Sequence, residues 1–318
     1  MASGRVLGGA KTLRRMAVAL LAVAAIAGLS GCGGGASNDG RPIVVATTTM
    51  IADAVRVIGG DDVNVVSIMR EGEDPHSYDV KPRDATVIAE ADLVLMNGLH
   101  LEATLAHIVD DNAEGAVVRL AEHEGIETLG DGPGANVAPD PHCWMDVQYF
   151  KRYAEGVRDA LIAMDPEHAE GYRARAEAYL AELDELDAWV REQVATIPEA
   201  RRVIISSHDA FGYYGAAYGL EVHGVAGIST DQQVRARHIG TLEALIAQRG
   251  IPAVFGETSV RDALNNQINA IAEHTDAVVS DTKLYSDSLG PDGTPEGTYI
   301  GMIRHNTSAI VEALRGDE

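Results

Sequence analysis

Three of the eleven histidines occupy similar positions in the sequence. His76 and His142 each end an Asp-Pro-His tripeptide, and His208 directly follows an apolar run that predicts a β-strand. Proline fixes the turn and so directs the imidazole that follows it. In open α/β sheets, ligands bind outside the carboxyl ends of the strands. Three histidines in such equivalent positions predict a shared ligand site, whereas we interpret the other eight as surface or helix residues.

A carboxylate completes the predicted site. Asp287 lies in the stretch Leu-Tyr-Ser-Asp-Ser-Leu-Gly (284–290), in a loop that follows a predicted strand at 277–279. Imidazoles with one carboxylate suit Zn²⁺ or another divalent first-row ion. Four protein ligands leave no open position for an activating water, as expected of a site that holds a metal without catalysis. Because imidazoles must be neutral to bind a metal, affinity is expected to weaken below about pH 6.5.

Two similar series of strands and helices are expected to position these residues. The predicted strands span residues 43–46, 63–69, 92–96, 203–205, 253–255 and 277–279. The predicted helices within the two series span residues 51–58, 85–91, 210–218 and 299–314. Continuous Val/Ile/Leu runs separated by helices indicate parallel strands covered on both faces. The predicted fold is therefore α/β, with two lobes of mostly parallel sheet flanked by helices.

One long helix is predicted between the two lobes. Asp165-Pro166 is typical of a helix start, and the next proline is Pro198. Between them, apolar residues recur in steps of three or four, at Tyr172, Ala176, Tyr179, Leu183, Leu186, Val190, Val194 and Ile197. A coiled coil is the alternative, but no heptads continue beyond this span. We therefore expect a single rigid helix over residues 166–197 that joins the lobes.

The N-terminal residues indicate an export signal. Arg14 and Arg15 precede an apolar run over 16–27, which is too short to span a bilayer and fits the apolar region of a signal peptide. Leu-Ser-Gly-Cys (29–32) follows and resembles the bacterial lipoprotein signal, in which Cys32 becomes the lipidated first residue. The alternative is an ordinary secretory signal with an incidental cysteine. The Gly-rich residues after Cys32 predict a flexible tether.

The charge of the chain is unevenly distributed. The 318 residues contain 25 Lys and Arg against 48 Asp and Glu, for a net charge of −23. Four of the basic residues and none of the acidic ones lie in the first 31, so the remainder carries −27. Such acidity argues against nucleic acid or an anionic membrane surface as the main partner and is compatible with cationic ligands.

Several motifs together resemble a known family. They are Asp-Pro-His-Ser-Tyr (74–78), Ala-Asp-Leu…Asn-Gly-Leu-x-Leu-Glu (91–102), Asp-Pro-His-x-Trp-x-Asp (140–146), His-Asp-Ala-Phe-Gly-Tyr (208–213) and Leu-Tyr-Ser-Asp-Ser-Leu-Gly…Gly-Thr-x-x-Gly-Thr-Tyr…His-Asn (284–306). In this combination and order they resemble the zinc/manganese solute-binding lipoproteins of bacterial ABC transporters. The resemblance covers residues 42–315.

The resemblance implies two lobes joined by one long helix, with the metal between them. Carried over by motif, the metal ligands are His76, His142, His208 and Asp287, and the cargo is Zn²⁺ or Mn²⁺. It also implies a cognate ABC permease as partner, a lipid anchor at Cys32 on the outside of the cell membrane, and no enzymatic activity. Histidine at position 208, where some members have glutamate, places the chain among three-His, one-Asp members that take zinc, manganese or both. The His-rich loop of many zinc-specialised members is absent, since 121–140 holds one histidine.

The resulting domain organisation has five parts. They are a lipoprotein signal peptide (1–31), a flexible tether (32–41), an N-terminal metal-binding lobe (42–164), a long linking helix (165–198) and a C-terminal metal-binding lobe (199–318).

Two residues near the motifs have open roles. Glu257 fits a recurrent family glutamate, either as an alternative metal ligand or, as we expect, as a hydrogen-bond or ion-pair partner of one. Cys143 follows His142 directly, and we interpret it as a small buried hydrophobe with thiol coordination as the alternative. With Cys32 lipidated, no intramolecular disulfide is available.

Other functional classes remain as alternatives. A secreted zinc-dependent hydrolase is one, but His-Glu-x-x-His and Gly-x-Ser-x-Gly motifs are missing. A surface adhesin role is another, since some family members were named for attachment. A receptor for a bulky chelate or vitamin would need aromatic or basic cleft residues, and the chain has only two Trp and three Phe.

Overall fold

The computed structural model describes residues 1, 40–130 and 139–316, and the chain divides into two compact units, 1–40 and 41–318. The predicted signal peptide, Cys32 and almost all of the tether lie outside the described residues. The second unit contains the fold and the predicted site. None of the described helices has the length and apolarity needed to cross a membrane.

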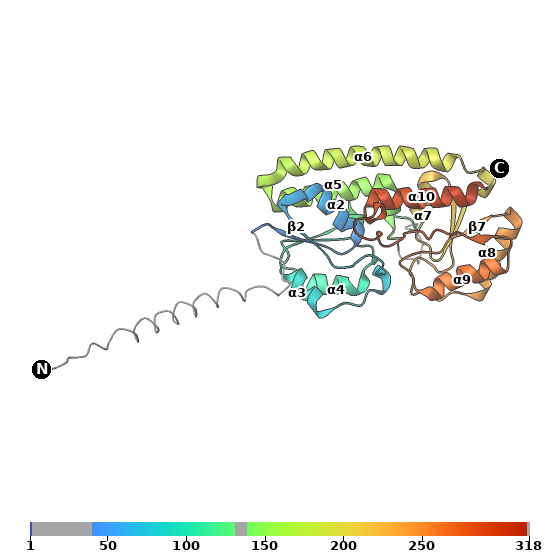
Figure 1. Ribbon diagram of the computed structural model, residues 1–318, viewed down its shortest axis with the longest axis horizontal. Coiled ribbons are helices and arrows are strands. Elements are labelled where there is room, and N and C mark those ends of the chain that lie inside the picture. The colour runs from blue at the N-terminus through green and yellow to red at the C-terminus, as the bar shows by residue number, and fades with distance from the viewer. Residues whose placement is uncertain (2–39, 131–138, 317–318) are drawn as a thin grey trace. The chain divides into compact units, whose positions relative to one another are not determined.

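The N-terminal lobe is built on a four-stranded parallel sheet. Its strands are β1 (Ile43–Ala46), β2 (Asn64–Ser67), β3 (Leu93–Met96) and β4 (Ala116–Arg119), in the order β2-β1-β3-β4. The helices of this lobe are α2 (Thr49–Gly59), α3 (Pro82–Ala89) and α4 (Ala103–Asn112). Figure 1 shows α2 on one side of this sheet and α3 and α4 on the other.

Strand β1 shows why these strands read as continuous apolar runs. Val44 and Ala46 pack into the core cluster that includes residues of α2, whereas Val45 packs into a second cluster with residues of α3 and α4. Successive side chains of a strand point to opposite faces, so a strand covered by helices on both faces needs apolar residues throughout.

The C-terminal lobe contains two pairs of parallel strands. β5 (Val203–Ser206) pairs with β6 (Glu221–Gly224), and β7 (Ala253–Val254) pairs with β8 (Val278–Val279). A parallel bridge between Ser206 and Phe255 connects the two pairs. The helices of this lobe are α7 (Gly212–Tyr218), α8 (Ala236–Arg249), α9 (Asp262–Glu273) and α10 (Tyr299–Arg315).

A long helix links the lobes, as the sequence predicts. It begins with a 3₁₀ turn, η5 (Pro166–His168), and continues as α6 (Ala169–Ala195), so the regular α-helix is shorter at both ends than the predicted 166–197. Its 27 residues span about 40 Å. In Figure 1, α6 lies along both lobes, next to the preceding helix α5 (Val147–Met164). The α/β two-lobed fold class predicted from the sequence is confirmed.

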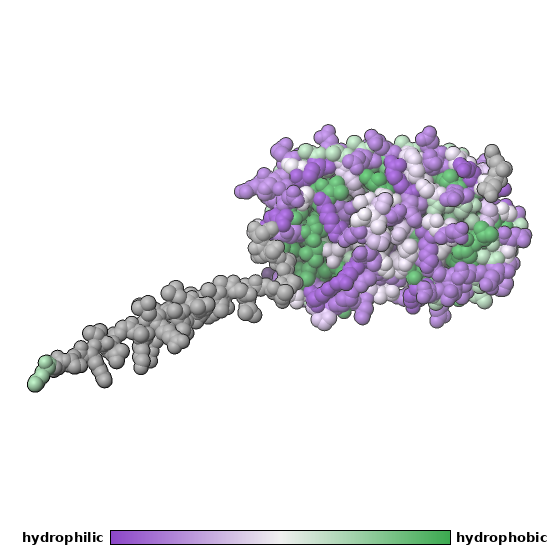
Figure 2. Space-filling model, viewed as in Figure 1, coloured by the Kyte–Doolittle hydropathy of each residue, from purple (hydrophilic) through white to green (hydrophobic). Residues whose placement is uncertain are grey.

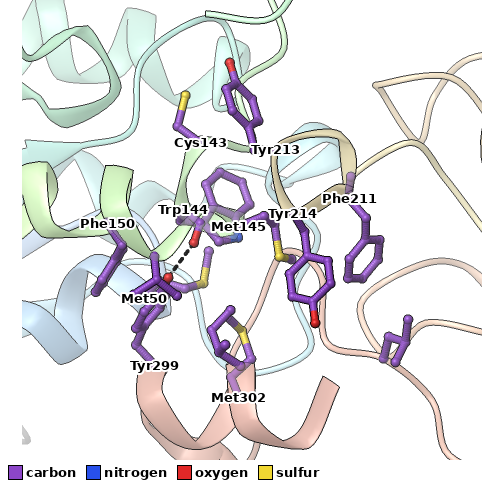
Figure 3. Close-up of a cluster of buried hydrophobic side chains, with 14 of the residues drawn as sticks. Met50, Cys143, Trp144, Met145, Phe150, Phe211, Tyr213, Tyr214, Tyr299 and Met302 are labelled. Atoms are coloured by element: carbon purple, nitrogen blue, oxygen red, sulfur yellow. Dashed lines mark hydrogen bonds between the residues drawn. The ribbon is translucent and has the colours of Figure 1, made fainter. Parts of the chain in front are cut away.

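An aromatic seam joins the two lobes; we define it as Trp144, Phe150 and Tyr299 (Figure 3). The Tyr299 hydroxyl at the start of α10 donates to the Trp144 carbonyl at 2.7 Å, and the Tyr299 and Phe150 rings stack with centroids 3.4 Å apart. Trp144 Nε1 also donates to the carbonyl of Ser286 at 3.0 Å, next to the predicted ligand Asp287. All three seam side chains are buried, so this contact holds the lobes together next to the site.

The surface agrees with the acidic composition. Hydrophilic residues predominate on the face shown in Figure 2, with smaller apolar areas between them. Val57, Leu129 and Val278 are large hydrophobic residues in the second unit that are exposed, and they are scattered along the chain. Scattered apolar residues of this kind are normal for a folded surface.

Candidate metal centre

The four predicted metal ligands come from four separate segments of the second unit. His76 lies in the 3₁₀ turn η2 (Pro75–Ser77), and His142 directly precedes the 3₁₀ turn η4 (Cys143–Met145). His208 lies two residues after β5, and Asp287 lies in the loop between β8 and the turn η7 (Pro295–Gly297). The first two belong to the N-terminal lobe and the last two to the C-terminal lobe.

The fold brings these four residues together. One donor atom from each can be chosen such that all four lie within 4.8 Å of one another. His76 Nε2 is 3.2 Å from His142 Nε2, His142 Nε2 is 3.4 Å from Asp287 Oδ1, and His208 Nε2 is 3.2 Å from Asp287 Oδ2. Donors placed tetrahedrally around Zn²⁺ at its usual bond lengths are about 3.3 Å apart. The spacing of the donors therefore suits a small divalent ion at their centre.

Three of the donor atoms are buried and lack a hydrogen bond. They are His208 Nε2 and both carboxylate oxygens of Asp287. Buried polar atoms in folded proteins nearly always have a partner, because leaving one unpaired costs about 1–3 kcal/mol. A cation bound among the four residues would satisfy all three atoms at once.

The two Asp-Pro-His tripeptides share one hydrogen bond. In each, the aspartate accepts a hydrogen bond from the backbone N–H of the histidine, at 2.9 Å from His76 to Asp74 and at 3.0 Å from His142 to Asp140. An Asp side chain commonly bonds the backbone two residues on, and the proline between them fixes the backbone. The tripeptide therefore holds its histidine at a defined angle.

Carboxylates orient two of the three imidazole rings through hydrogen bonds to Nδ1. His142 Nδ1 bonds Asp140 Oδ1 at 2.7 Å, and His208 Nδ1 bonds Glu257 Oε2 at 2.7 Å. Glu257 also accepts from the backbone N–H of His208 at 2.8 Å. Such bonds leave Nε2 facing the other predicted ligands and make it a more basic donor for a metal. Among the described residues, none bonds Nδ1 of His76.

The charges of the site shift the pKa of its groups in opposite directions. Burial lowers the pKa of His142, but the charge and hydrogen bond of Asp140, together with the charge of Asp287, outweigh it and raise that pKa to about 9. Burial likewise opposes the charges of Glu257 and Asp287 at His208, which hold its pKa well above the usual value. For His76, burial dominates and lowers the pKa to about 3.

The Asp287 carboxylate stays ionised within this site. Burial raises its pKa, but the adjacent His208 and His142 outweigh burial and hold the pKa well below its usual range. The site without metal therefore contains an anionic carboxylate between two imidazoles that readily carry a proton. A divalent cation would replace those protons.

The structure gives the positions of Glu257 and Cys143, whose roles the sequence leaves open. Glu257 contacts His208 through the face that points away from the other ligands, so the structure favours the orienting role over direct coordination. Cys143 is buried, and its Sγ lies 4.0 Å from the Asp140 carbonyl, outside the four-residue group. Burial raises the pKa of the Cys143 thiol to about 12, which fits an inert core residue.

Two residues that support the site have no role that the sequence predicts. Asp140 was assigned only to the motif, although its carboxylate orients His142. A signal was present, because both predicted N-lobe ligands have an aspartate two residues before them. Thr230 donates its hydroxyl to Asp74 across the lobes at 2.7 Å, and nothing in the sequence pairs residues so far apart.

Comparison with known proteins places the chain in a family. The family described as "Zinc-uptake complex component A periplasmic" matches residues 44–313. The chain belongs to this family. Zinc-binding protein TroA of Treponema pallidum is 37% identical over 306 residues, which cover 94% of this chain and 98% of TroA. Manganese-binding lipoprotein MntA of Bacillus subtilis is 36% identical, with 94% and 98% covered.

A solved structure of a family member supports the fold. The periplasmic zinc-binding protein TroA from Treponema pallidum superimposes with a TM-score of 0.80 at 38% identity, covering 86% of this chain and 99% of TroA. The family resemblance inferred from the motifs is therefore confirmed. One relative is named as a zinc-binding protein, another as a manganese-binding lipoprotein, and a third, from Streptococcus anginosus, as the substrate-binding lipoprotein of a manganese ABC transporter.

Proposed function

We propose that this protein is the extracytoplasmic receptor of a metal importer, which captures one Zn²⁺ or Mn²⁺ ion and delivers it to a cognate ABC permease. The ligands in this proposal are His76, His142, His208 and Asp287. The relatives support it, because they include a zinc-binding protein and manganese-binding lipoproteins, some named as substrate-binding components of ABC transporters.

One observation carries the proposal. Four donor side chains from both lobes converge, and the two Asp287 oxygens at their centre are buried without a hydrogen bond. A set of four protein ligands is typical of a site that holds an ion, since a catalytic zinc keeps a position for water. The hydrolase and adhesin alternatives gain no support from the family or from this geometry.

The choice of metal follows from ligand chemistry. Imidazole suits zinc well, and sites of nitrogen and oxygen donors generally bind Zn²⁺ more tightly than Mn²⁺. We therefore propose that the purified protein binds both ions and that zinc has the higher affinity. Manganese transport would then depend on the supply of each metal outside the membrane.

We also propose the location and the domain boundaries. Residues 1–31 direct export, Cys32 carries the lipid anchor, and residues 32–41 tether the receptor to the membrane. Residues 42–164 and 199–318 form the two metal-binding lobes, and 165–198 form the link. The relatives named as lipoproteins support the anchored location.

Elemental analysis of the purified protein tests the function. We expect one equivalent of metal in the wild type and in His107→Ala, which alters an exposed histidine away from the site. His76→Ala and Asp287→Ala should lose most of the metal. Unchanged metal content in both site variants would overturn the proposed ligand set.

A further inference from the structure

The two lobes also contact each other away from the aromatic seam. The segment that carries His76, which we call the His76 loop (residues 70–77), makes two hydrogen bonds to the C-terminal lobe. The backbone N–H of Gly72 donates to Ser288 Oγ at 2.7 Å, and the Thr230 hydroxyl donates to Asp74 Oδ2 at 2.7 Å. Ser288 directly follows the predicted ligand Asp287. The loop that supplies one ligand is thus attached to the opposite lobe.

Asp74 connects the backbone of His76 to that opposite lobe. Its Oδ1 accepts the backbone N–H of His76 at 2.9 Å, while its Oδ2 accepts the hydroxyls of Thr230 and of Ser77. A carboxylate that bonds both partners resists movement of either relative to the other, because hydrogen bonds to a charged group are the stronger ones.

Thr230 is held in place within the C-terminal lobe. Its side chain and backbone are fully buried, and its carbonyl accepts a hydrogen bond from the Arg261 guanidinium at 2.9 Å. Moving the His76 loop away from the C-terminal lobe would therefore break the Asp74–Thr230 bond rather than drag Thr230 along. The bond joins residues 156 positions apart that belong to different lobes, so it requires the two lobes to lie against each other as they do in this structure.

His76 differs from the other two histidines in how it is held. His142 and His208 are fully buried, and each ring is fixed by a carboxylate on Nδ1, whereas His76 is partly exposed and has no such partner among the described residues. The position of the His76 ring therefore depends on the position of its loop.

We propose that Asp74 is a positioning residue, which keeps His76 over the metal by bonding Thr230 of the opposite lobe, and that this bond slows metal release. The inference rests on the proposed metal-binding function. It concerns the lifetime of the bound ion, since the four ligands themselves stay unchanged when the Asp74–Thr230 bond is removed.

The test measures how fast zinc leaves the protein. Zinc-loaded protein is mixed with excess EDTA in a stopped-flow instrument, and the association rate is measured separately with Zn²⁺ alone. Thr230→Val removes the hydroxyl at nearly constant volume and should raise the dissociation rate about tenfold or more, with one zinc still bound and the association rate within about twofold of wild type. Thr230→Ser restores the hydroxyl and should return the dissociation rate to near wild type.

Two further variants complete the design. Thr241→Val makes the same change on the exposed surface of α8, where the hydroxyl bonds only Arg237 of its own helix, and should leave the rate unchanged. Asp74→Asn changes the other, partly exposed partner of the bond and weakens it, so this variant should also speed zinc loss. It provides the test if Thr230→Val does not fold.

The outcomes separate this inference from the proposed function. Wild-type dissociation rates in both Thr230→Val and Asp74→Asn would overturn the positioning role, as would a Thr230→Ser protein that loses zinc as fast as Thr230→Val. A wild-type protein that binds no zinc would instead overturn the proposed function.

Discussion

At the scale of single residues, the site depends on carboxylates that do not touch the metal position. Asp140 and Glu257 each bond the Nδ1 atom of a histidine at 2.7 Å, and both are buried with that histidine. A carboxylate behind an imidazole fixes the ring and raises its basicity, and its loss typically weakens metal affinity by about 10–100-fold.

Glu257→Gln tests this effect. The amide keeps the size of the side chain but loses the charge, so we expect zinc affinity to fall by about tenfold or more with one ion still bound. Glu243→Gln is the matched control, because Glu243 bonds the exposed ring of His274 at 3.0 Å away from the site, and it should not change affinity. Competitive titration against a chelator measures both, and equal affinities would contradict the role of Glu257.

The pKa of His142 predicts how binding depends on pH. Because this pKa is raised to about 9, the metal-free protein holds a proton on His142 at neutral pH, and metal must displace it. Apparent affinity should therefore continue to rise from pH 6.5 to about pH 9, a wider range than the unperturbed histidine value indicates. Calorimetry in buffers of different ionisation enthalpy should detect protons released at pH 7.5; binding that releases none would contradict this.

The same shift predicts the stability of the metal-free protein. A histidine whose pKa is raised on folding contributes stability that is fully present below its unfolded pKa, about 6.5, and is lost as pH rises through its folded pKa. The free energy of unfolding should fall between pH 6.5 and about 9. Urea titrations of metal-free protein at several pH values measure this, and a flat or rising profile across that range would count against the assignment.

At the scale of elements, the sequence predicted those strands that are runs of apolar residues. The strand at 43–46 was predicted with its observed bounds, because β1 is apolar on both faces. Strand β4 (Ala116–Arg119) and strand β6 (Glu221–Gly224) were missed. Neither is fully buried, and the charged or polar residues within them interrupt the apolar run on which the prediction depended.

In the candidate site, the sequence predicted the ligands but not the hydrogen bonds that support them. The four proposed ligands, which lie together in the structure, were predicted from their motifs, since Asp-Pro-His turns and strand ends leave a local signal. The bonds that support them, such as Asp74 to Thr230, join residues of different lobes and exist only after the chain has folded. Local patterns contain no information about such pairs.

Helix α6 allows a prediction about stability. Its buried face includes Leu183, which is fully covered, whereas the neighbouring Glu185 is exposed. Leu183→Ala should lower the free energy of unfolding by about 2–5 kcal/mol, because it removes buried methyl groups and leaves a cavity. Glu185→Ala should change it by less than about 0.5 kcal/mol. Chemical denaturation of the metal-free proteins compares them, and a loss below about 1 kcal/mol in Leu183→Ala would contradict the packing of α6.

At the scale of the whole molecule, the strong acidity of the chain describes its surface more than its site. The net charge of −23 is the balance of 48 acidic and 25 basic residues, and the proposed ligand set uses one of the acidic residues. In the proposed site, neutral imidazoles and a single carboxylate would hold the ion once the protons have left. The surrounding acid keeps the receptor soluble and attracts cations at long range.

The proposed lipid anchor at Cys32 concerns the whole molecule. Cys32→Ser should abolish lipid attachment and move the receptor from the membrane fraction to the soluble fraction, with its zinc affinity unchanged because the site lies in the second unit. Fractionation of cells that express each form measures this. A variant that stays in the membrane fraction would contradict the proposed anchor.

The central claim is that His76, His142, His208 and Asp287 together hold one divalent ion between the lobes. Anomalous X-ray diffraction from crystals of the zinc-loaded protein, recorded on both sides of the zinc absorption edge, tests it most directly. We predict one strong anomalous peak within about 2.0–2.2 Å of the three Nε2 atoms and the Asp287 carboxylate. A zinc peak elsewhere in the protein, or none between these four residues, would contradict the claim.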